Sequence, residues 1–170
     1  MRSADSLTYR ELLSILQEAI RQFNENETYL INNDLSERCI NSKLAMYVDR
    51  VLEEWEIDGA NVDVEYNRGF NRSGYLVKTL HGKRIFPDMV VHKREYDDVY
   101  GFLNLICVEM KKEKDRRGFE NDLERLRALT HPYNGYGFHL GAFVVIVANK
   151  RLNDYHLEIR DAFVDGELYY

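Results

Sequence analysis

Residues 84 to 92 have the sequence RIFPDMVVH, and residues 103 to 113 have the sequence LNLICVEMKKE. Both stretches are apolar enough to be buried β-strands, and the polar segment between them is short enough for an antiparallel hairpin. Asp88 nevertheless follows directly after a proline, and Glu109 and Lys111 lie near the end of the second stretch. An unpaired buried charge costs several kcal/mol or is lost through a pKa shift. These three charges therefore need an explanation beyond packing.

The hydrophobic pattern predicts one α/β domain over residues 1–170, with helices flanking a mixed central sheet. A chain of 170 residues with 45% apolar residues is long enough for one core. Period-3.6 and period-2 patterns give the order helix, helix, strand, strand, strand, helix, strand, followed by a short hairpin at Asp165-Gly166. The helices are expected over residues 6–24, 34–55 and 119 to a stop before Pro132, and the strands over residues 60–66, 84–92, 103–113 and 140–150.

Positive charge gathers around the two opening strands, although the whole chain carries a net charge of −6. Residues 68 to 117 hold 12 Lys and Arg against 7 Asp and Glu, a net of +5, and the remainder is 11 − 22 = −11. The glycine-containing stretch 68–84 is interpreted either as a solvated hairpin or as a loop that contacts nucleic-acid phosphates. Lys112 and Lys114 are likewise either a solvated run or phosphate contacts. The residues predicted to bind nucleic acid are Arg68, Arg72, Lys83, Arg84, Lys112 and Lys114.

Several other classes of protein are disfavoured by missing signals. No run of about 20 uncharged apolar residues is present, and the N-terminus lacks the apolar core of a signal peptide. We therefore expect a cytoplasmic protein without membrane contacts. The histidines form neither HxxxH nor HExxH, and no glycine loop fits GxGxxG or the Walker A pattern, which disfavours zinc-peptidase and nucleotide-driven motor chemistry.

The charged strand residues have the spacing of a metal site. Glu109 and Lys111 are two residues apart, so their side chains leave the same face of a strand, and Asp88 lies on the hairpin partner. Glu37 either joins them from the second helix or merely caps that helix in a box with Asp34. Glu65 is either a solvated edge residue or a further member. Clustered carboxylates suit Mg²⁺ or Mn²⁺, and a neighbouring lysine can orient a metal-bound water for phosphodiester hydrolysis.

Pro87-Asp88, followed after 20 residues by Glu109-Met110-Lys111, resembles the PD-(D/E)XK superfamily of restriction-endonuclease-like nucleases. The order helix, three strands, helix, strand from about 34 to 149 is similar to the αβββαβ core of that superfamily, with an extra helix at the N-terminus. The segments SERCINSKLAMYV, VEYNR and FPDMVVHKR resemble small stand-alone bacterial or phage members.

The resemblance implies a role for each matching residue. Asp88 and Glu109 would be metal ligands together with the main-chain carbonyl of Met110, and Lys111 would be the catalytic lysine. Glu37 would be an additional or water-mediated ligand of Mg²⁺ or Mn²⁺. The implied activity is hydrolysis of DNA, ahead of RNA, and endonuclease rather than exonuclease, because the segment GFENDLERLRALT lacks a QxxxY signature.

Two alternatives to an active nuclease remain open from the sequence. In the first, Lys111 neutralises Asp88 and Glu109 in a salt-bridged structural network, in a fold whose catalysis has decayed. In the second, the chain is a non-catalytic subunit that binds nucleic acid or protein on the same fold. Because no separate sequence-reading domain is present, a second copy or a protein partner is also a candidate for choosing the substrate.

Overall fold

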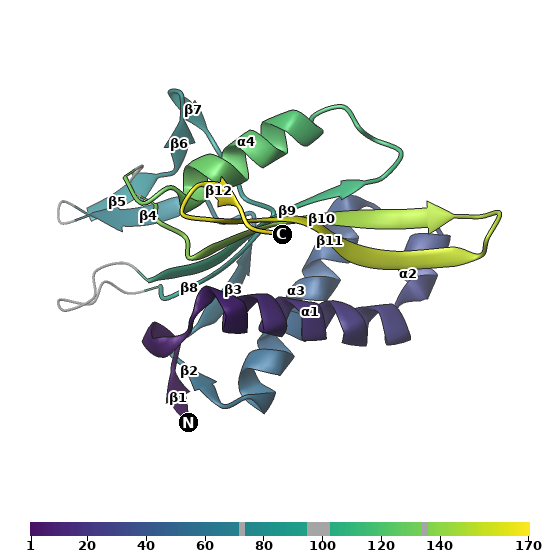
Figure 1. Ribbon diagram of the computed structural model, residues 1–170, viewed down its shortest axis with the longest axis horizontal. Helices are drawn as coiled ribbons and strands as arrows, with labels where there is room; N and C mark the ends of the chain where they lie inside the picture. The colour runs from purple at the N-terminus through teal and green to yellow at the C-terminus, as the bar shows by residue number, and fades with distance from the viewer. Residues whose placement is uncertain (72–73, 95–102, 134–135) are drawn as a thin grey trace.

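A computed structural model of the chain describes residues 1–71, 74–94, 103–133 and 136–170. These residues form an α/β fold in which a six-stranded sheet has helices on both faces (Figure 1). The strand order is β12-β11-β10-β9-β8-β3, with one parallel pair, β9 and β10, among antiparallel neighbours. The predicted α/β class and the mixed sheet flanked by helices are therefore confirmed.

The elements follow the chain in the order helices, strands, helix, strands. The helices are η1 (Ala4–Ser6), α1 (Tyr9–Asn26), α2 (Thr28–Asn32), α3 (Glu37–Glu54) and α4 (Phe119–Thr130). The six strands of the main sheet are β3 (Asn61–Val64), β8 (Met89–His92), β9 (Asn104–Lys112), β10 (Leu140–Asn149), β11 (Asp154–Val164) and β12 (Glu167–Leu168). Three small two-stranded pairs are formed by β1 (Arg2–Ser3) with β2 (Ile57–Asp58), β4 (Arg68–Asn71) with β5 (Gly74–Val77), and β6 (Thr79–Leu80) with β7 (Lys83–Arg84).

Strand β10 shows why the sheet is covered on both sides. Its residues are almost all buried, and successive side chains enter two different apolar clusters. Val144 and Ile146 pack in the cluster that includes α1 and α3, while Phe143 and Val145 pack in the cluster beneath α4. This is the period-2 alternation of a strand, with both faces apolar because both are covered.

Helix α4 makes the crossover that the parallel pairing of β9 and β10 requires. It packs closely on the sheet at Gly141, where a Cβ atom would lie 2.9 Å from Cγ2 of Thr130. The absence of a side chain at Gly141 thus allows the helix to approach the sheet. As a result, the first turns of α4 lie over the charged end of β9.

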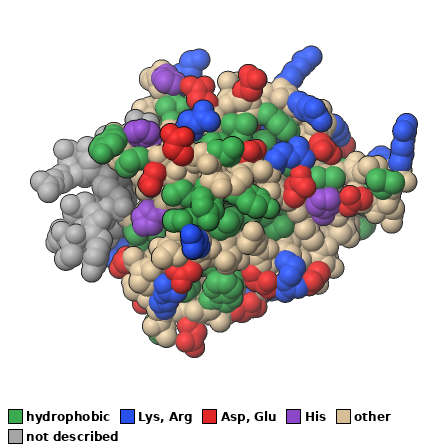
Figure 2. All heavy atoms as spheres, in the orientation of Figure 1, with side chains coloured by type: hydrophobic (Ala, Val, Ile, Leu, Met, Phe, Trp, Pro, Cys, Tyr) green, Lys and Arg blue, Asp and Glu red, His purple; other side chains and the backbone are tan. Residues whose placement is uncertain are grey.

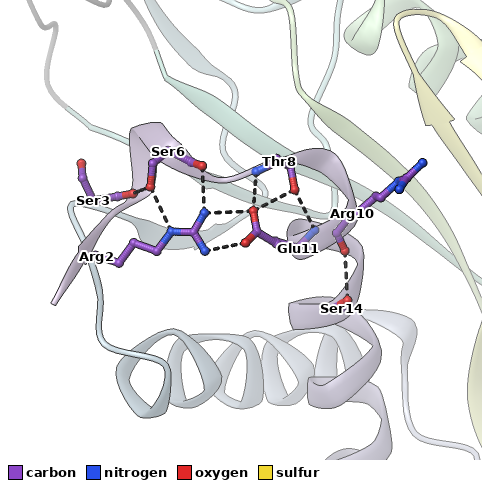
Figure 3. A network of polar contacts seen from close by, with 7 residues as sticks. All are labelled: Arg2, Ser3, Ser6, Thr8, Arg10, Glu11 and Ser14. Atoms are coloured by element: carbon purple, nitrogen blue, oxygen red, sulfur yellow. Dashed lines mark hydrogen bonds and ion pairs between the residues drawn. The ribbon is translucent and has the colours of Figure 1, made fainter.

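The N-terminal helix begins three residues later than the pattern suggested. Thr8 and Glu11 form a reciprocal capping box at its start, and Arg2 donates to the Glu11 carboxylate (Figure 3). Arg2 and Thr8 together lower the pKa of Glu11 to about 2. The start of α1 is thereby joined to β1, which pairs in parallel with β2 beyond the far end of α3.

Three predicted details were wrong. The start of α3 is capped by Ser36, whose side chain accepts from the Cys39 N–H, rather than by Asp34. Asp34 instead adopts a left-handed φ of 54°, which Asp tolerates better than most residues. The tail contains the 11-residue strand β11 rather than a short hairpin alone, and α2 occupies a segment where no element was expected. The alternation of β11 is weak because most of its residues are only half-buried and a register shift against β10 interrupts the period.

None of the helices in the described part of the chain is long and apolar enough to cross a membrane. Acidic and basic side chains are interspersed over the face of the molecule that Figure 2 shows. Many of these are paired, as in the ladder of Glu18, Arg21 and Glu25 on α1. Exposed pairs of this kind contribute little to stability.

One buried cation stands apart from these surface pairs. Lys78 is 2% exposed, and its Nζ donates to the Arg68 carbonyl and lies 4.9 Å from the centre of the Tyr66 ring. No described carboxylate lies within ion-pair distance of it. Burial therefore lowers the pKa of Lys78 to about 8.

The pKa of Lys78 predicts how stability depends on pH. The folded protein releases this proton near pH 8 and the unfolded chain near 10.5, so the unfolded chain binds more protons between these values. Lys78 should therefore make the free energy of unfolding rise with pH across that window, a contribution opposed above about pH 9 by the buried Cys107 thiol, whose pKa is raised. Lys78→Met should raise it by about 1 to 3 kcal/mol at pH 7 and remove the rise above pH 8. Urea unfolding at pH 7, 9 and 10 measures both effects, with exposed Lys83→Met as the control. Equal pH dependence in wild type and Lys78→Met would contradict the prediction.

A candidate metal-assisted hydrolytic site

The paired ends of β8 and β9 bring the predicted carboxylates together. Asp88 lies just before β8, and its Oδ2 accepts from the Met110 N–H at 2.7 Å. The Asp88 carbonyl accepts from Nδ2 of Asn41 on α3 at 2.6 Å. The side chain thus continues the hydrogen bonding between the two strands beyond the point where β8 begins, which fixes it beside Glu109. Burial raises the pKa of Asp88, although the Met110 N–H opposes this.

Glu109 is the most deeply buried carboxylate of the group, with 2% of its side chain exposed. Nη1 of Arg125 lies 3.2 Å from its Oε1 and donates to its Oε2 at 3.4 Å. Oε1 accepts no hydrogen bond in spite of this proximity, so the ion pair is poorly aligned. Burial raises the pKa of Glu109 well above its usual range, and the Asp88 carboxylate raises it further.

Lys111 leaves the same face of β9 as Glu109, as its spacing predicted. Its Nζ lies 3.6 Å from Oε2 of Glu37 and 3.7 Å from Oδ2 of Asp122. Burial opposes the charge on this amine, but the surrounding carboxylates, Asp122 and Glu37 foremost, raise the pKa of Lys111. The amine is therefore held protonated between α3 and α4, with 28% of the side chain open to solvent.

Glu37 does not cap its own helix. It is the first residue of α3, and its Oε1 accepts from the main-chain N–H of Lys112 at 2.8 Å, while Oε2 faces Lys111. The structure therefore excludes the interpretation of Glu37 as merely a helix cap. Glu37 bridges from α3 to the end of β9.

Two site residues, Asp122 and Arg125, were missed in the sequence. They are one turn apart on α4 and form an ion pair of 2.6 Å between Nη2 and Oδ1. The Asp122 side chain is 4% exposed, burial raises its pKa, and its Oδ2 accepts no hydrogen bond. One signal was available: Asp122 lies three residues after Phe119 and four before Leu126, on the apolar stripe of the helix. A carboxylate on such a stripe indicates a site.

The site has more negative than positive charge. Its four carboxylates face two cations, so the formal charge with all groups ionised is −4 + 2 = −2, and two buried carboxylate oxygens accept no hydrogen bond. The four carboxylates are Glu37, Asp88, Glu109 and Asp122, and the two cations are Lys111 and Arg125. A divalent ion with oxygen ligands fits this donor set by charge and by chemistry. Within the described ranges, however, no three His, Cys, Asp or Glu side chains are close enough together to hold a metal ion. The four carboxylates therefore lie in one region but do not enclose a position for an ion.

The other residues proposed from the sequence lie around this site or away from it. The Glu65 carboxylate is 2.7 Å from Nη2 of Arg38, an exposed ion pair, and does not join the four carboxylates. Lys112 and Lys114 both contact the Asp34 carboxylate. Arg68 on β4 and both Lys83 and Arg84 on β7 are exposed. Arg72 lies outside the described residues.

Comparisons with known proteins leave the site to be interpreted on its own geometry. Scans of protein-family models, curated proteins and solved structures gave no significant match to this chain.

Because four carboxylates lie close together, we predict that Glu109 lowers the free energy of unfolding when no divalent ion is bound. Glu109→Gln replaces the most deeply buried carboxyl group with a neutral amide, which has no ionised form to bury, and Arg125 keeps its closer partner Asp122. We expect the free energy of unfolding at pH 7 in EDTA to rise by about 1 kcal/mol. Urea unfolding measures this change. The control is Glu124→Gln, which changes an exposed carboxylate on α4, the helix that carries Arg125, and should alter the free energy of unfolding by less than about 0.5 kcal/mol. A loss of stability in Glu109→Gln would show that the Arg125 pair outweighs the crowding.

Proposed function

We propose that the protein is a divalent-metal-dependent nuclease that hydrolyses phosphodiester bonds of DNA. The observation that carries the proposal is the excess negative charge where β8 begins and β9 ends, with two buried carboxylate oxygens that accept no hydrogen bond beside a protonated lysine. A purely structural cluster would be expected to balance its charges and satisfy its oxygens.

Asp88 and Glu109 are the residues that would hold Mg²⁺ or Mn²⁺, with the Met110 carbonyl and Glu37 as further ligands. A bound ion would act as a Lewis acid on a phosphoryl oxygen and lower the pKa of a bound water. The rigidity of the site favours this role. Asp88 is fixed by the Met110 N–H and Glu37 by the Lys112 N–H, both on β9. Carboxylates fixed by main-chain donors keep their positions when an ion arrives.

Lys111 and Arg125 have different tasks in the proposed site. The Lys111 amine is partly solvent-exposed and is held by two carboxylates at more than 3.5 Å, so it can reach a water or a phosphate oxygen. Arg125 shields Glu109 and Asp122 from each other while the site contains no ion. We therefore assign Lys111 to orienting the attacking water and Arg125 to positioning the two carboxylates.

A basic cleft next to the site supports DNA as the substrate. This β7 cleft, about 430 Å³ in volume, lies between the β6–β7 hairpin and α4, and its lining includes Lys83, Arg84, Phe86, Asn121 and Arg125. The Phe86 ring is 46% exposed and immediately precedes Pro87-Asp88. Cations beside an exposed ring are suited to phosphate contact and base stacking.

One observation favours the alternative of a non-catalytic binding subunit. Arg125 already contacts Glu109 and Asp122, and the carboxylates are not close enough to enclose an ion as they stand. In that case the same residues would form a self-neutralising network, and the β7 cleft would bind nucleic acid without cutting it. Cleavage and metal binding separate the two functions.

Cleavage of linear, circular and single-stranded DNA with Mn²⁺ tests the proposal. Lys111→Ala should reduce the rate by at least about 100-fold, the usual effect of losing a group that acts on the reacting water. Asp88→Asn should abolish Mn²⁺ binding measured by calorimetry. Lys43→Ala is the matched lysine control. Lys43 lies on α3, and its Nζ is 3.1 Å from the Glu27 carboxylate rather than paired with a residue of the site. This variant should cut DNA like wild type.

Two results would contradict the nuclease proposal. One is the absence of any cleavage together with no Mn²⁺ binding that depends on Asp88. The other is cleavage that survives Lys111→Ala unchanged, which would place the chemistry elsewhere. Tight, salt-dependent DNA binding without cleavage would favour the binding subunit.

A further inference from the structure

A second basic groove lies on the opposite side of β9 from the β7 cleft. We name it the α2–β10 groove. It consists of two hollows of about 450 and 350 Å³ that share five lining residues, Ile31, Asp34, Glu113, Lys114 and Ala148, so they form one continuous depression. Lys112 at its inner end is the residue whose main-chain N–H binds Glu37, so the groove begins directly beside the candidate site.

The charge of this groove is opposite to that of the chain as a whole. Five cations and two carboxylates line it, a net of +5 − 2 = +3 against −6 for the protein. The cations are Lys112, Lys114, Arg116, Lys150 and Arg151, and the carboxylates are Asp34 and Glu113. The side chains of Arg116, Lys150 and Arg151 form no ion pair with any described residue, so they remain available to a ligand.

The Asp34 carboxylate forms ion pairs with the other two cations, Lys112 and Lys114. It lies 2.8 Å from Nζ of Lys112 and 3.0 Å from Nζ of Lys114, and the pair lowers the pKa of Asp34 to about 2. Asp34 is 59% exposed on its side chain, so these contacts are open to competition from solvent and ions. A phosphate arriving in the groove would compete with a single carboxylate for two lysines.

The groove also offers some apolar and aromatic surface, which narrows the class of ligand. Ile31, Ile40 and Ile146 line its floor but are 2%, 0% and 2% exposed, so the surface open to a ligand comes from exposed Ala148 and half-buried Tyr155 at the outer end. A DNA duplex offers phosphates to a surface and keeps the faces of its bases stacked. An unpaired strand offers both phosphates and exposed base faces, and proteins bind such strands with a positive groove and apolar or aromatic platforms.

We propose that the α2–β10 groove binds an unpaired DNA strand adjoining the scissile bond, with Asp34 as a competitor for its phosphates. The proposal rests on the proposed nuclease function, because it takes the end of β9 as the place where the bond is cut. It implies substrates in which duplex and single strand meet, or wholly single-stranded DNA.

The test is binding of a fluorescent single-stranded oligodeoxynucleotide, followed by anisotropy in EDTA so that no cleavage occurs. Asp34→Asn frees two lysines without backbone strain, since Asn also accepts a left-handed φ. Each added phosphate contact on a single strand steepens the salt slope by about 0.7, so the affinity that it adds is roughly threefold larger at about 50 mM than at about 200 mM salt. We therefore expect Asp34→Asn to bind at least about threefold tighter than wild type at about 50 mM salt. By about 200 mM this advantage should shrink about threefold for one freed lysine and roughly sevenfold for two, with a salt slope steeper by about 1.4 for two contacts.

Two variants serve as controls for this gain. Asp58→Asn makes the same change of charge beyond the far end of α3, whose 18 residues separate the two positions by about 27 Å. It should leave binding unchanged. Lys150→Ala/Arg151→Ala, at the outer end of the groove, should weaken single-strand binding several-fold and affect a blunt duplex of equal length less.

Equal effects of Asp34→Asn and Asp58→Asn, or an equal gain for the blunt duplex, would overturn the groove assignment. The assay also separates this proposal from the nuclease proposal. Strand binding that follows the groove variants without any Mn²⁺-dependent cutting would overturn the enzyme and leave the groove. Cutting with groove variants that bind like wild type would overturn the groove and leave the enzyme.

Discussion

The structure depends on the burial of charge at the carboxyl end of β9. This strand is covered by α1 and α3 on one face and by α4 on the other, so polar side chains near its end have little access to water. The ionised forms of Glu109 and Asp122 are stabilised by Lys111 and Arg125, yet burial still raises the pKa of both carboxyl groups. Burial of such groups costs free energy that apolar side chains of similar size would not cost. The apolar remainder of the sheet offsets this cost.

Each element around β9 has a defined part in holding that charge. Strand β8 brings Asp88 to the Met110 N–H, α3 brings Glu37 to the Lys112 N–H, and α4 brings Asp122 and Arg125 over the strand. The carboxylates on β8 and α3 are therefore fixed by main-chain donors, whereas those on β9 and α4 are balanced by side chains. Main-chain donors cannot move without breaking the sheet. Side-chain cations can withdraw, so an arriving ion would rearrange Lys111 and Arg125 rather than Asp88 and Glu37.

Much of this arrangement was predictable because the sheet has a strong local signal. The apolar runs of β8, β9 and β10 and the helical stripe of α4 gave the elements and the pairing that bring Asp88 close to Glu109. Asp122 and Arg125 were not found, because a carboxylate on a helix is ordinary unless the buried face of that helix is considered. The cap at Ser36 was missed for a different reason: Asp34 and Glu37 match a capping box in spacing, yet both carboxylates have tertiary partners on β9 or just beyond it. Local spacing cannot show that a long-range partner competes for the same side chain.

The turn between α2 and α3 links the candidate site to the α2–β10 groove and also keeps them independent. Asp34 and Glu37 lie three residues apart and contact the same stretch of β9, but in different ways. Glu37 accepts from the main-chain N–H of Lys112, whereas Asp34 binds the side-chain amines of Lys112 and Lys114. Those amines can leave Asp34 for a phosphate while the main-chain bond to Glu37 stays in place. A strand could thus enter the groove without displacing the carboxylates that would hold the ion, so capture of the strand and assembly of the metal site need not compete.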